Sequence, residues 1–169
     1  MRHLFLFDLD GTCIDSTHRQ GETLDDWKRM NTAKNIWADT LLPYANVLRN
    51  TMAEGLDCGI LTSRVLSAID YAFLDHHGLT PRLIMSRSKH NNLPCGQFKL
   101  AELLLLARTN GIEWDTFAKN TILFDDDLDV QETLRKNRVR VVAPESVSYT
   151  HLRAHETVLE LVCRLLLEK

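Results

Sequence analysis

Short apolar runs alternate along the chain with longer segments whose apolar residues recur at helical spacing. Five of the runs predict strands, at residues 4–8, 58–62, 82–86, 121–125 and 139–143. They are almost continuously apolar, as is typical of parallel strands that helices cover on both faces. Helices are predicted between them at 43–55, 65–78, 97–110 and 128–137. The alternation predicts an α/β fold with a doubly wound, parallel five-stranded sheet and right-handed crossovers.

Residues 15–42 interrupt this alternation. The segment is polar, holds Trp27 and Trp37, and is expected to form a loop and one helix around 27–38. It follows the first strand directly, where the ligand-facing loops of such sheets lie. The two tryptophans can stack on a base, although packing of a helix onto the sheet is the commoner use of such residues.

Composition and charge narrow the class of protein. The chain has 169 residues, of which 44% are hydrophobic and 25% charged, and a formal net charge of −3. This charge argues against non-specific coating of nucleic acid, which favours basic proteins. No apolar run approaches the roughly 20 residues that cross a bilayer, so no membrane partner is expected. Four scattered cysteines without a CxxC pair favour a reducing, cytoplasmic location.

The character of the sequence changes near residue 146. We therefore assign one domain to residues 1–146 and a helical tail to residues 147–169. The tail resembles translated adapter or linker sequence, which favours a non-native origin. The alternative is a final amphipathic helix that packs on the sheet.

Polar side chains follow the predicted strands at the points where they end. Asp8 and Asp10 follow the first strand, and Thr62 ends the second. Asp125 and Asp126 close the fourth strand, and a lysine, Lys99, opens the helix before it. Because the carboxyl ends of parallel strands meet at one edge of a sheet, we expect these groups to converge.

This set of groups suits phosphoryl transfer. Asp8 can attack phosphorus and form an aspartyl-phosphate. Asp10 can protonate the leaving oxygen and later activate water. Thr62 and Lys99 can bind the transferring phosphoryl group, whose charge spreads over its oxygens.

The crowded carboxylates also require a cation. Asp8, Asp125 and Asp126 offer only hard oxygen ligands, which favour Mg²⁺ over zinc. Each motif alone has a simpler interpretation. The acids at 125–127 can be a helix N-cap cluster, and Lys99 can be a solvated residue at a helix end. The prediction rests on their occurrence together and in this order.

At this level the sequence resembles the haloacid dehalogenase (HAD) superfamily. The matching motifs are residues 5–12 (Phe-Leu-Phe-Asp-Leu-Asp-Gly-Thr), Leu61-Thr62-Ser63, Lys99 and residues 122–126 (Ile-Leu-Phe-Asp-Asp). The resemblance implies the roles given above. It adds Asp10 to the metal site through its carbonyl, and it places Gly11, Thr12 and Ser63 beside the substrate.

A narrower resemblance concerns the substrate. Residues 15–19, Asp26-Trp27, Asp39 with Leu42-Pro43, and residues 85–87 are similar to the phosphatase half of phage polynucleotide kinase/phosphatase and its phage and bacterial relatives. This group removes 3′-phosphates from nucleic-acid ends. Asp127 stands where that group commonly has arginine, and the kinase half is absent.

The motif spacing predicts an open site without a cap domain. Only about 28 residues (15–42) separate the first strand from its helix, and about 37 separate Thr62 from Lys99. A site without a cap can admit a large substrate. A modest basic rim is expected to bind its phosphate, unless these are ordinary surface charges. Its members are His18, Arg19, Arg64, Arg82, Arg87 and Lys89.

Together these features predict a Mg²⁺-dependent phosphomonoester hydrolase that acts on a nucleotide or on a nucleic-acid 3′-phosphate. One alternative is a phosphatase of small molecules, such as nucleoside monophosphates or sugar phosphates. Another is a regulatory domain that binds phosphoryl groups with little turnover. No oligomeric state follows from the sequence.

Overall fold

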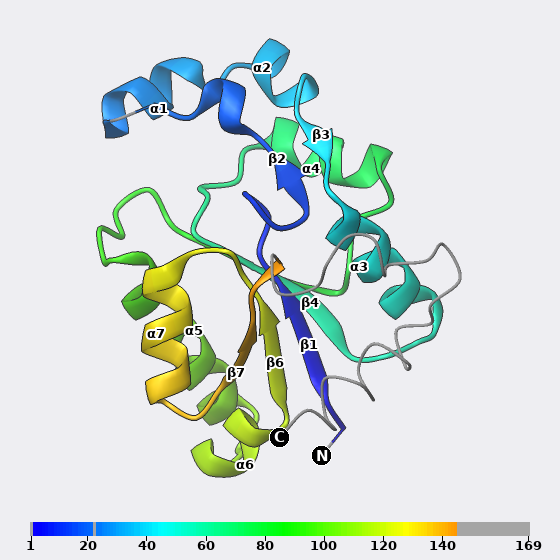
Figure 1. Cartoon of the computed structure of the whole chain (residues 1–169), viewed down its shortest axis with the longest axis vertical. Coiled ribbons are helices and arrows are strands. Elements are labelled where there is room, and N and C mark those ends of the chain that lie inside the picture. The colour runs from blue at the N-terminus through cyan, green and yellow to red at the C-terminus, as the bar shows by residue number, and fades with distance from the viewer. Residues whose placement is uncertain (1, 22, 145–169) are drawn as a thin grey trace.

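Five parallel strands form the centre of the molecule (Figure 1). The computed structural model describes residues 2–21 and 23–144. In spatial order the strands are β5 (Leu83–Ser86), β4 (Cys58–Thr62), β1 (Leu4–Phe7), β6 (Thr121–Phe124) and β7 (Arg140–Val142). Phe7 of the central strand lies opposite Ile60 on one side and Phe124 on the other. The predicted α/β fold with a five-stranded parallel sheet is confirmed, and each strand lies within one residue of its expected bounds.

Helices cover both faces of the sheet (Figure 1). One face carries α3 (Pro43–Ala53) and α4 (Ala68–His76), and the other carries α5 (Cys95–Thr109), α6 (Trp114–Lys119) and α7 (Leu128–Lys136). Helix α6 was not expected, because six residues are too few to show a helical period. Helix α4 begins three residues later than predicted. Ser67 caps it in a capping box with Asp70, which fixes its first turn.

The alternation of side chains along each strand divides the core into two halves. Phe5 and Phe7 point to the face of α3 and α4, whereas Leu6 points to the face of α5 and α7. Each of these three side chains is at most 3% exposed. Because the strands are apolar on both faces, each half of the core holds its helices against the same sheet.

The segment that follows β1 lies beyond the carboxyl ends of the strands (Figure 1). It contains β2 (Ile14–Asp15), a 3₁₀ turn (Thr17–Arg19), α1 (Leu24–Met30), α2 (Ala33–Trp37) and β3 (Thr40–Leu41). The prediction of a single helix around 27–38 is wrong, because two short helices cover this range. The chain breaks at Asn31, and Thr32 then caps a second helix by accepting a hydrogen bond from the Asn35 backbone N–H.

This segment is too short to form a separate cap domain, and no second domain is inserted within residues 23–144, as expected. Among the described helices, none combines the length and apolar character that crossing a membrane requires. The predicted tail, residues 147–169, lies outside the described residues.

Candidate active site

Two strand ends and one helix bring a buried lysine between two aspartates. Asp8 follows β1, Asp125 follows β6, and Lys99 lies in the second turn of α5. The Lys99 ammonium donates a hydrogen bond to Asp125 Oδ2 at 2.6 Å and lies 2.7 Å from Asp8 Oδ1. The lysine is only 1% exposed. The structure therefore brings together three residues that the sequence predicted to meet.

Helix packing explains how Lys99 reaches this place. Gly96, one turn earlier, lies so close to α7 that an added Cβ would come within 2.8 Å of the Asp129 carbonyl oxygen. Its backbone N–H donates to the Asp129 carboxylate at 2.8 Å. The N-terminus of α5 is thus held against α7, which directs Lys99 toward the edge of the sheet.

The environment of the Asp8 carboxyl group disfavours its ionised form. Burial raises its pKa to about 8, with Asp125 and Asp10 adding to the rise and Lys99 opposing it. The contact with Lys99 lacks hydrogen-bond alignment, so Asp8 Oδ1 is buried without a hydrogen-bond partner among the described residues. Burial also raises the pKa of Asp125, again against the opposing charge of Lys99. Two carboxylates therefore share one cation.

A third carboxylate completes an acidic group that can hold a metal ion. One oxygen each from Asp8, Asp125 and Asp126 lies within 4.8 Å of the others. The pKa of Asp126 is also raised by burial. The all-oxygen donor set fits a hard divalent cation such as Mg²⁺.

The loop after β1 is shaped around Asp126. Gly11 has a φ of 75°, and a Cβ there would lie 2.1 Å from Asp126 Oδ2. Thr12, which is buried, donates a hydrogen bond to Asp126 Oδ1 at 3.3 Å. Gly11 thus lets the chain turn and lets the carboxylate approach. Its expected place beside the substrate stays a prediction, as does that of Thr12.

Asp127 has a structural role. Its side chain accepts hydrogen bonds from the backbone N–H groups of Asp129 and Val130 and so caps α7. The N-cap interpretation of the acid run therefore holds for its third member, although Asp127 also lines, with Asp126, the cavity that adjoins this acidic group. Asp125 is buried against Lys99.

An open cavity of about 660 Å³ adjoins the acidic group. Thr62 and Ser63 at the end of β4 line it together with Asp8, Asp10 and Lys99. Ser63 Oγ is buried without a hydrogen-bond partner among the described residues, and Thr62 Oγ1 accepts the backbone N–H of Arg64. The remaining wall is mixed: Gln20, Thr23, Asn91 and Asn92 are polar, and Val65, Leu93, Pro94 and Cys95 are apolar.

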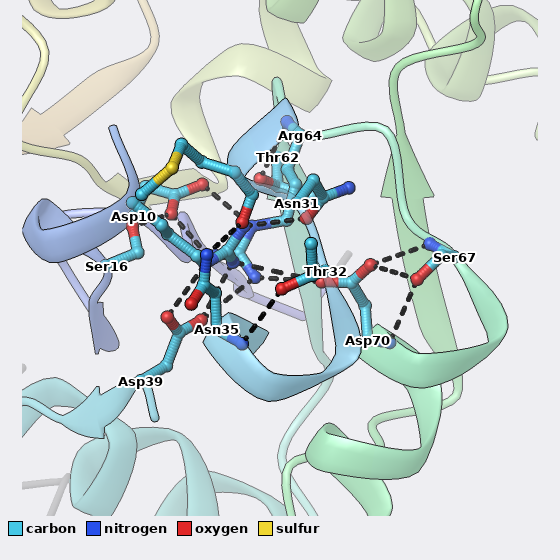
Figure 2. Close-up of polar contacts among 12 residues, drawn as sticks. Asp10, Ser16, Asn31, Thr32, Asn35, Asp39, Thr62, Arg64, Ser67 and Asp70 are labelled. Carbon is cyan, nitrogen blue, oxygen red and sulfur yellow. Dashed lines mark hydrogen bonds and ion pairs between the residues drawn. The ribbon is translucent and has the colours of Figure 1, made fainter. Parts of the chain in front are cut away.

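Asp10 lies at the edge of the cavity, and its carboxylate accepts hydrogen bonds from Arg64 and Ser16. Arg64 Nε donates to Asp10 Oδ2 at 3.0 Å, and Arg64 Nη2 and Ser16 Oγ both donate to Oδ1 (Figure 2). Burial raises the pKa of Asp10, but the bonds and charge of Arg64, with Ser16 and Arg19, outweigh it. The pKa is therefore below its usual value.

Arg19 and His18 were expected on a basic rim. Arg19 is only 1% exposed, and it donates from Nε and Nη2 to the two carboxylate oxygens of Asp39, both at 2.8 Å. The His18 ring lies 3.6 Å from Asp39 and 2.9 Å from the Asn35 carbonyl oxygen. Both residues thus make contacts within the segment that follows β1 and stabilise its conformation.

The other basic residues of the expected rim are also dispersed. Arg87 lines the cavity but donates to the carbonyl oxygens of Ser63, Asn91 and Leu93, at 3.0, 3.1 and 2.6 Å. Arg82 directly precedes β5, at the opposite end of the strand, and lines a different cavity, so it is not part of this edge. Lys89 is exposed on the loop after β5.

Trp37 packs α2 against α4. Its ring lies edge-on to Phe73 and His76, with centroids 5.8 and 5.5 Å apart. It does not line the cavity beside Asp8, which favours the packing interpretation over base stacking. The side chain of Trp27 lies outside the described part of the structure. Cys13 is buried, and burial raises the pKa of its thiol, consistent with no catalytic role.

Sequence reasoning gave no role to two buried acids, Asp39 and Asp70. Both contact Arg64, at 3.4 and 3.0 Å. Asp70 carried a local signal, since a serine three residues before an acid marks a capping box. Asp39 was part of the narrower resemblance, but its role as an arginine partner was not predictable, because those arginines lie 20 and 25 residues away in the sequence.

The fold is that of solved HAD-superfamily hydrolases. A haloacid dehalogenase-like hydrolase of Streptococcus pneumoniae superposes with a TM-score of 0.62 at 13% identity over 84% of each chain. A chain of the Pnkp1/Rnl/Hen1 RNA repair complex has a TM-score of 0.62 at 20% identity, over 84% of this chain and 42% of that one. At these identities the likeness establishes the fold.

Sequence comparison gives the family. Residues 1–99 match the model of the bacteriophage T5 5′-deoxynucleotidase family, and the chain belongs to this family. The 5′-deoxynucleotidase of Escherichia phage T5 is 35% identical over 89 residues, 47% of this chain. The chain covers 36% of the length of that relative. The predicted HAD-like fold is thus confirmed, and the family is that of the phage 5′-deoxynucleotidase.

Proposed function

We propose that the protein is a Mg²⁺-dependent phosphatase of deoxynucleoside 5′-monophosphates that works through an aspartyl-phosphate. The observation that carries the proposal is the cluster of Asp8, Lys99 and Asp125 at the mouth of an open cavity. Membership of the 5′-deoxynucleotidase family supports the choice of substrate. This choice corresponds to the nucleotide alternative of the sequence prediction and departs from a 3′-phosphate on a nucleic-acid end.

The first step transfers the phosphoryl group to the protein. A carboxylate oxygen of Asp8 attacks phosphorus, and the bond between phosphorus and the 5′ oxygen breaks. The leaving oxygen takes a proton from Asp10, which stands at the cavity edge two residues further on. This step requires the protonated form of Asp10, which Arg64 and Ser16 make the minor form in the free protein by lowering its pKa. Lys99 and Thr62 would bind the phosphoryl oxygens, since both line the same cavity.

The second step releases phosphate. Asp10, now ionised, accepts a proton from a water molecule as that water attacks phosphorus. The bond to Asp8 breaks, the carboxylate is restored, and inorganic phosphate leaves. Asp10 thereby regains the proton that it gave in the first step.

Asp8, Asp125 and Asp126 would hold the Mg²⁺ ion, with the Asp10 carbonyl as the further ligand that the family resemblance implies. When bound, the ion neutralises the carboxylates and the charge of the phosphoryl group. The proximity of the buried Asp8 and Asp125 carboxylates, which share the ammonium of Lys99, supports this assignment.

The openness of the site favours a second candidate substrate, a 3′-phosphate at a nucleic-acid end. No inserted cap domain encloses the cavity within the described chain, so a polymer end has access to Asp8. The volume of about 660 Å³ also accommodates a mononucleotide, because ligand pockets commonly span about 300–1,000 Å³.

A substrate panel tests the proposal. Phosphate release with Mg²⁺ is measured for a deoxynucleoside 5′-monophosphate, its 3′ isomer, a 3′-phosphorylated oligonucleotide and a hexose phosphate. We expect the highest kcat/KM for the 5′-monophosphate, and Asp8→Asn serves as the inactive control. Preference for the oligonucleotide would favour the polymer-end activity. Absence of turnover on every compound would contradict a phosphatase and favour a phosphoryl-binding domain.

A further inference from the structure

Arg64 is a buried arginine whose guanidinium lies behind the catalytic acid. It is 3% exposed, and its side chain is 1% exposed. Nε and Nη2 grip the two carboxylate oxygens of Asp10, one each (Figure 2). Such a two-point fork fixes the plane of a carboxylate as well as its position.

The same guanidinium is itself held from the far side. Arg64 Nη1 donates to Asp70 Oδ1 at 3.0 Å and to Asp39 Oδ2 at 3.4 Å. Asp70 belongs to the capping box of α4, and Asp39 is gripped by Arg19. Figure 2 shows these contacts as one continuous group. A helix end and the segment after β1 therefore set the position of Arg64.

Sequence reasoning placed Arg64 among the substrate ligands. The geometry points elsewhere, because all three guanidinium nitrogens already bind carboxylates. An arginine that bound phosphate would have to leave Asp10, Asp39 or Asp70 with a buried charge and fewer partners.

We propose that Arg64 is a positioning residue that acts on the substrate through Asp10. The inference rests on the proposed function and specifies how its general acid, Asp10, is oriented. Rotation of the Asp10 carboxyl group about its Cβ–Cγ bond would break at least one of its two hydrogen bonds to Arg64. The carboxyl group is thereby kept in one orientation at the edge of the cavity, where the leaving oxygen is expelled. Ser16, which also donates to Oδ1, assists from the other side.

The expected consequence depends on the leaving group. Proton donation by a well-placed acid contributes about 10²–10⁴-fold to a rate. Cleavage of an alkyl ester such as a nucleotide needs this proton, whereas a nitrophenolate leaves readily without it. The ratio kcat/KM covers the steps up to departure of the leaving group and so isolates this proton transfer from hydrolysis of the aspartyl-phosphate.

The test uses Arg64→Lys, which keeps the charge but removes the fork, and Ser16→Ala, a smaller change. For Arg64→Lys we expect kcat/KM to fall about 100-fold on a deoxynucleoside 5′-monophosphate. On 4-nitrophenyl phosphate we expect a fall of less than about tenfold. Ser16→Ala should shift the ratio of the two substrates in the same direction by a smaller factor. Inhibition by inorganic phosphate should stay unchanged in both variants.

Arg49→Lys is the matched control, because Arg49 binds the His77 carbonyl oxygen and Asn46 outside the site. It should leave the ratio of the two substrates as in the wild type. Equal losses on both substrates in Arg64→Lys and Ser16→Ala would overturn the inference. Weakened inhibition by phosphate in Arg64→Lys would overturn it too, since it would make Arg64 a direct phosphate ligand. A wild-type chain that cleaves neither ester would contradict the proposed function, and the inference with it.

Discussion

Two buried charged clusters lie side by side at the carboxyl ends of the strands, and they differ in how fully their charged groups are hydrogen-bonded. In the first, two aspartates share Lys99, and an oxygen of Asp8 has no hydrogen-bond partner among the described residues. The second holds two arginines and three aspartates, joined by repeated hydrogen bonds. Its members are Arg19, Arg64, Asp10, Asp39 and Asp70.

The difference separates a reacting group from its support. Each cluster holds one more aspartate than it has cations. The first makes few hydrogen bonds in a poorly solvated place, which suits a nucleophile that awaits a cation and a phosphoryl group. In the second, every guanidinium nitrogen of Arg19 and Arg64 already donates a hydrogen bond to a side chain, so a ligand would compete with these bonds. Asp10 and Arg64 both line the cavity, and Asp10 links the two clusters.

The largest expected effect comes from breaking the first cluster. Asp8→Asn removes the proposed nucleophile, and phosphatase turnover should fall by at least about 10⁴-fold. The folded protein should persist, because Lys99 keeps its bond to Asp125. Phosphate release and thermal unfolding measure the two effects. Turnover within tenfold of the wild type would exclude Asp8 as the nucleophile.

Breaking the second cluster should cost mainly stability. Asp39→Ala leaves Arg19 with a buried charge and without its carboxylate partner, and this should lower the free energy of unfolding by about 3–5 kcal/mol. The matched control is Asp115→Ala, which breaks an exposed ion pair with Arg138 and should change stability by about 0.5 kcal/mol or less. Denaturant titration compares the two. A loss for Asp39→Ala as small as that for Asp115→Ala would show that the second cluster does not support the fold.

The smallest expected effect is a pH dependence specific to the first cluster. The pKa of Asp8 is raised from 3.8 to about 8, so the metal-free folded state binds this proton more tightly than the unfolded state does. The contribution to stability is therefore full below the ordinary pKa and is lost as the pH rises toward 8. Between pH 6 and pH 8 the loss is at most about 2.7 kcal/mol.

Thermal unfolding with a chelator at these two pH values measures this loss. Asp8→Asn should remove it, and Mg²⁺ should oppose it by binding the ionised carboxylates. An equal pH dependence in the wild type and Asp8→Asn would show that Asp8 does not titrate in this range.

The two clusters also differ in how much of each could be predicted from the sequence. Asp8, Lys99 and Asp125 were predictable because strand ends meet at one edge and each residue follows its own strand or opens its own helix. The burial of Arg19 and Arg64 was not predictable, because their shared partner Asp39 lies in a segment without strong periodicity. The sequence alone does not distinguish an arginine that is available to a ligand from one that is paired with a buried aspartate.

The fold shows the same limit on a smaller scale. The five strands were clear from their apolar runs, whereas α6 is too short to show a period. The break between α1 and α2 depends on Thr32, whose capping role competes with continuation of the helix. Local hydrogen bonds of this kind set the boundaries, and hydrophobic pattern alone does not resolve them.

The loop after β5 has a consequence for the energetics of recognition. Arg87 ties it to the end of β4 and packs over the Phe98 ring, with its guanidinium 4.7 Å from the ring centroid. One wall of the cavity is thereby ordered before any substrate arrives. A ligand that contacts Asn91 or Asn92 would then lose little additional loop entropy on binding. Selectivity at this wall would reflect shape and hydrogen bonding, with little contribution from closure of a mobile lid.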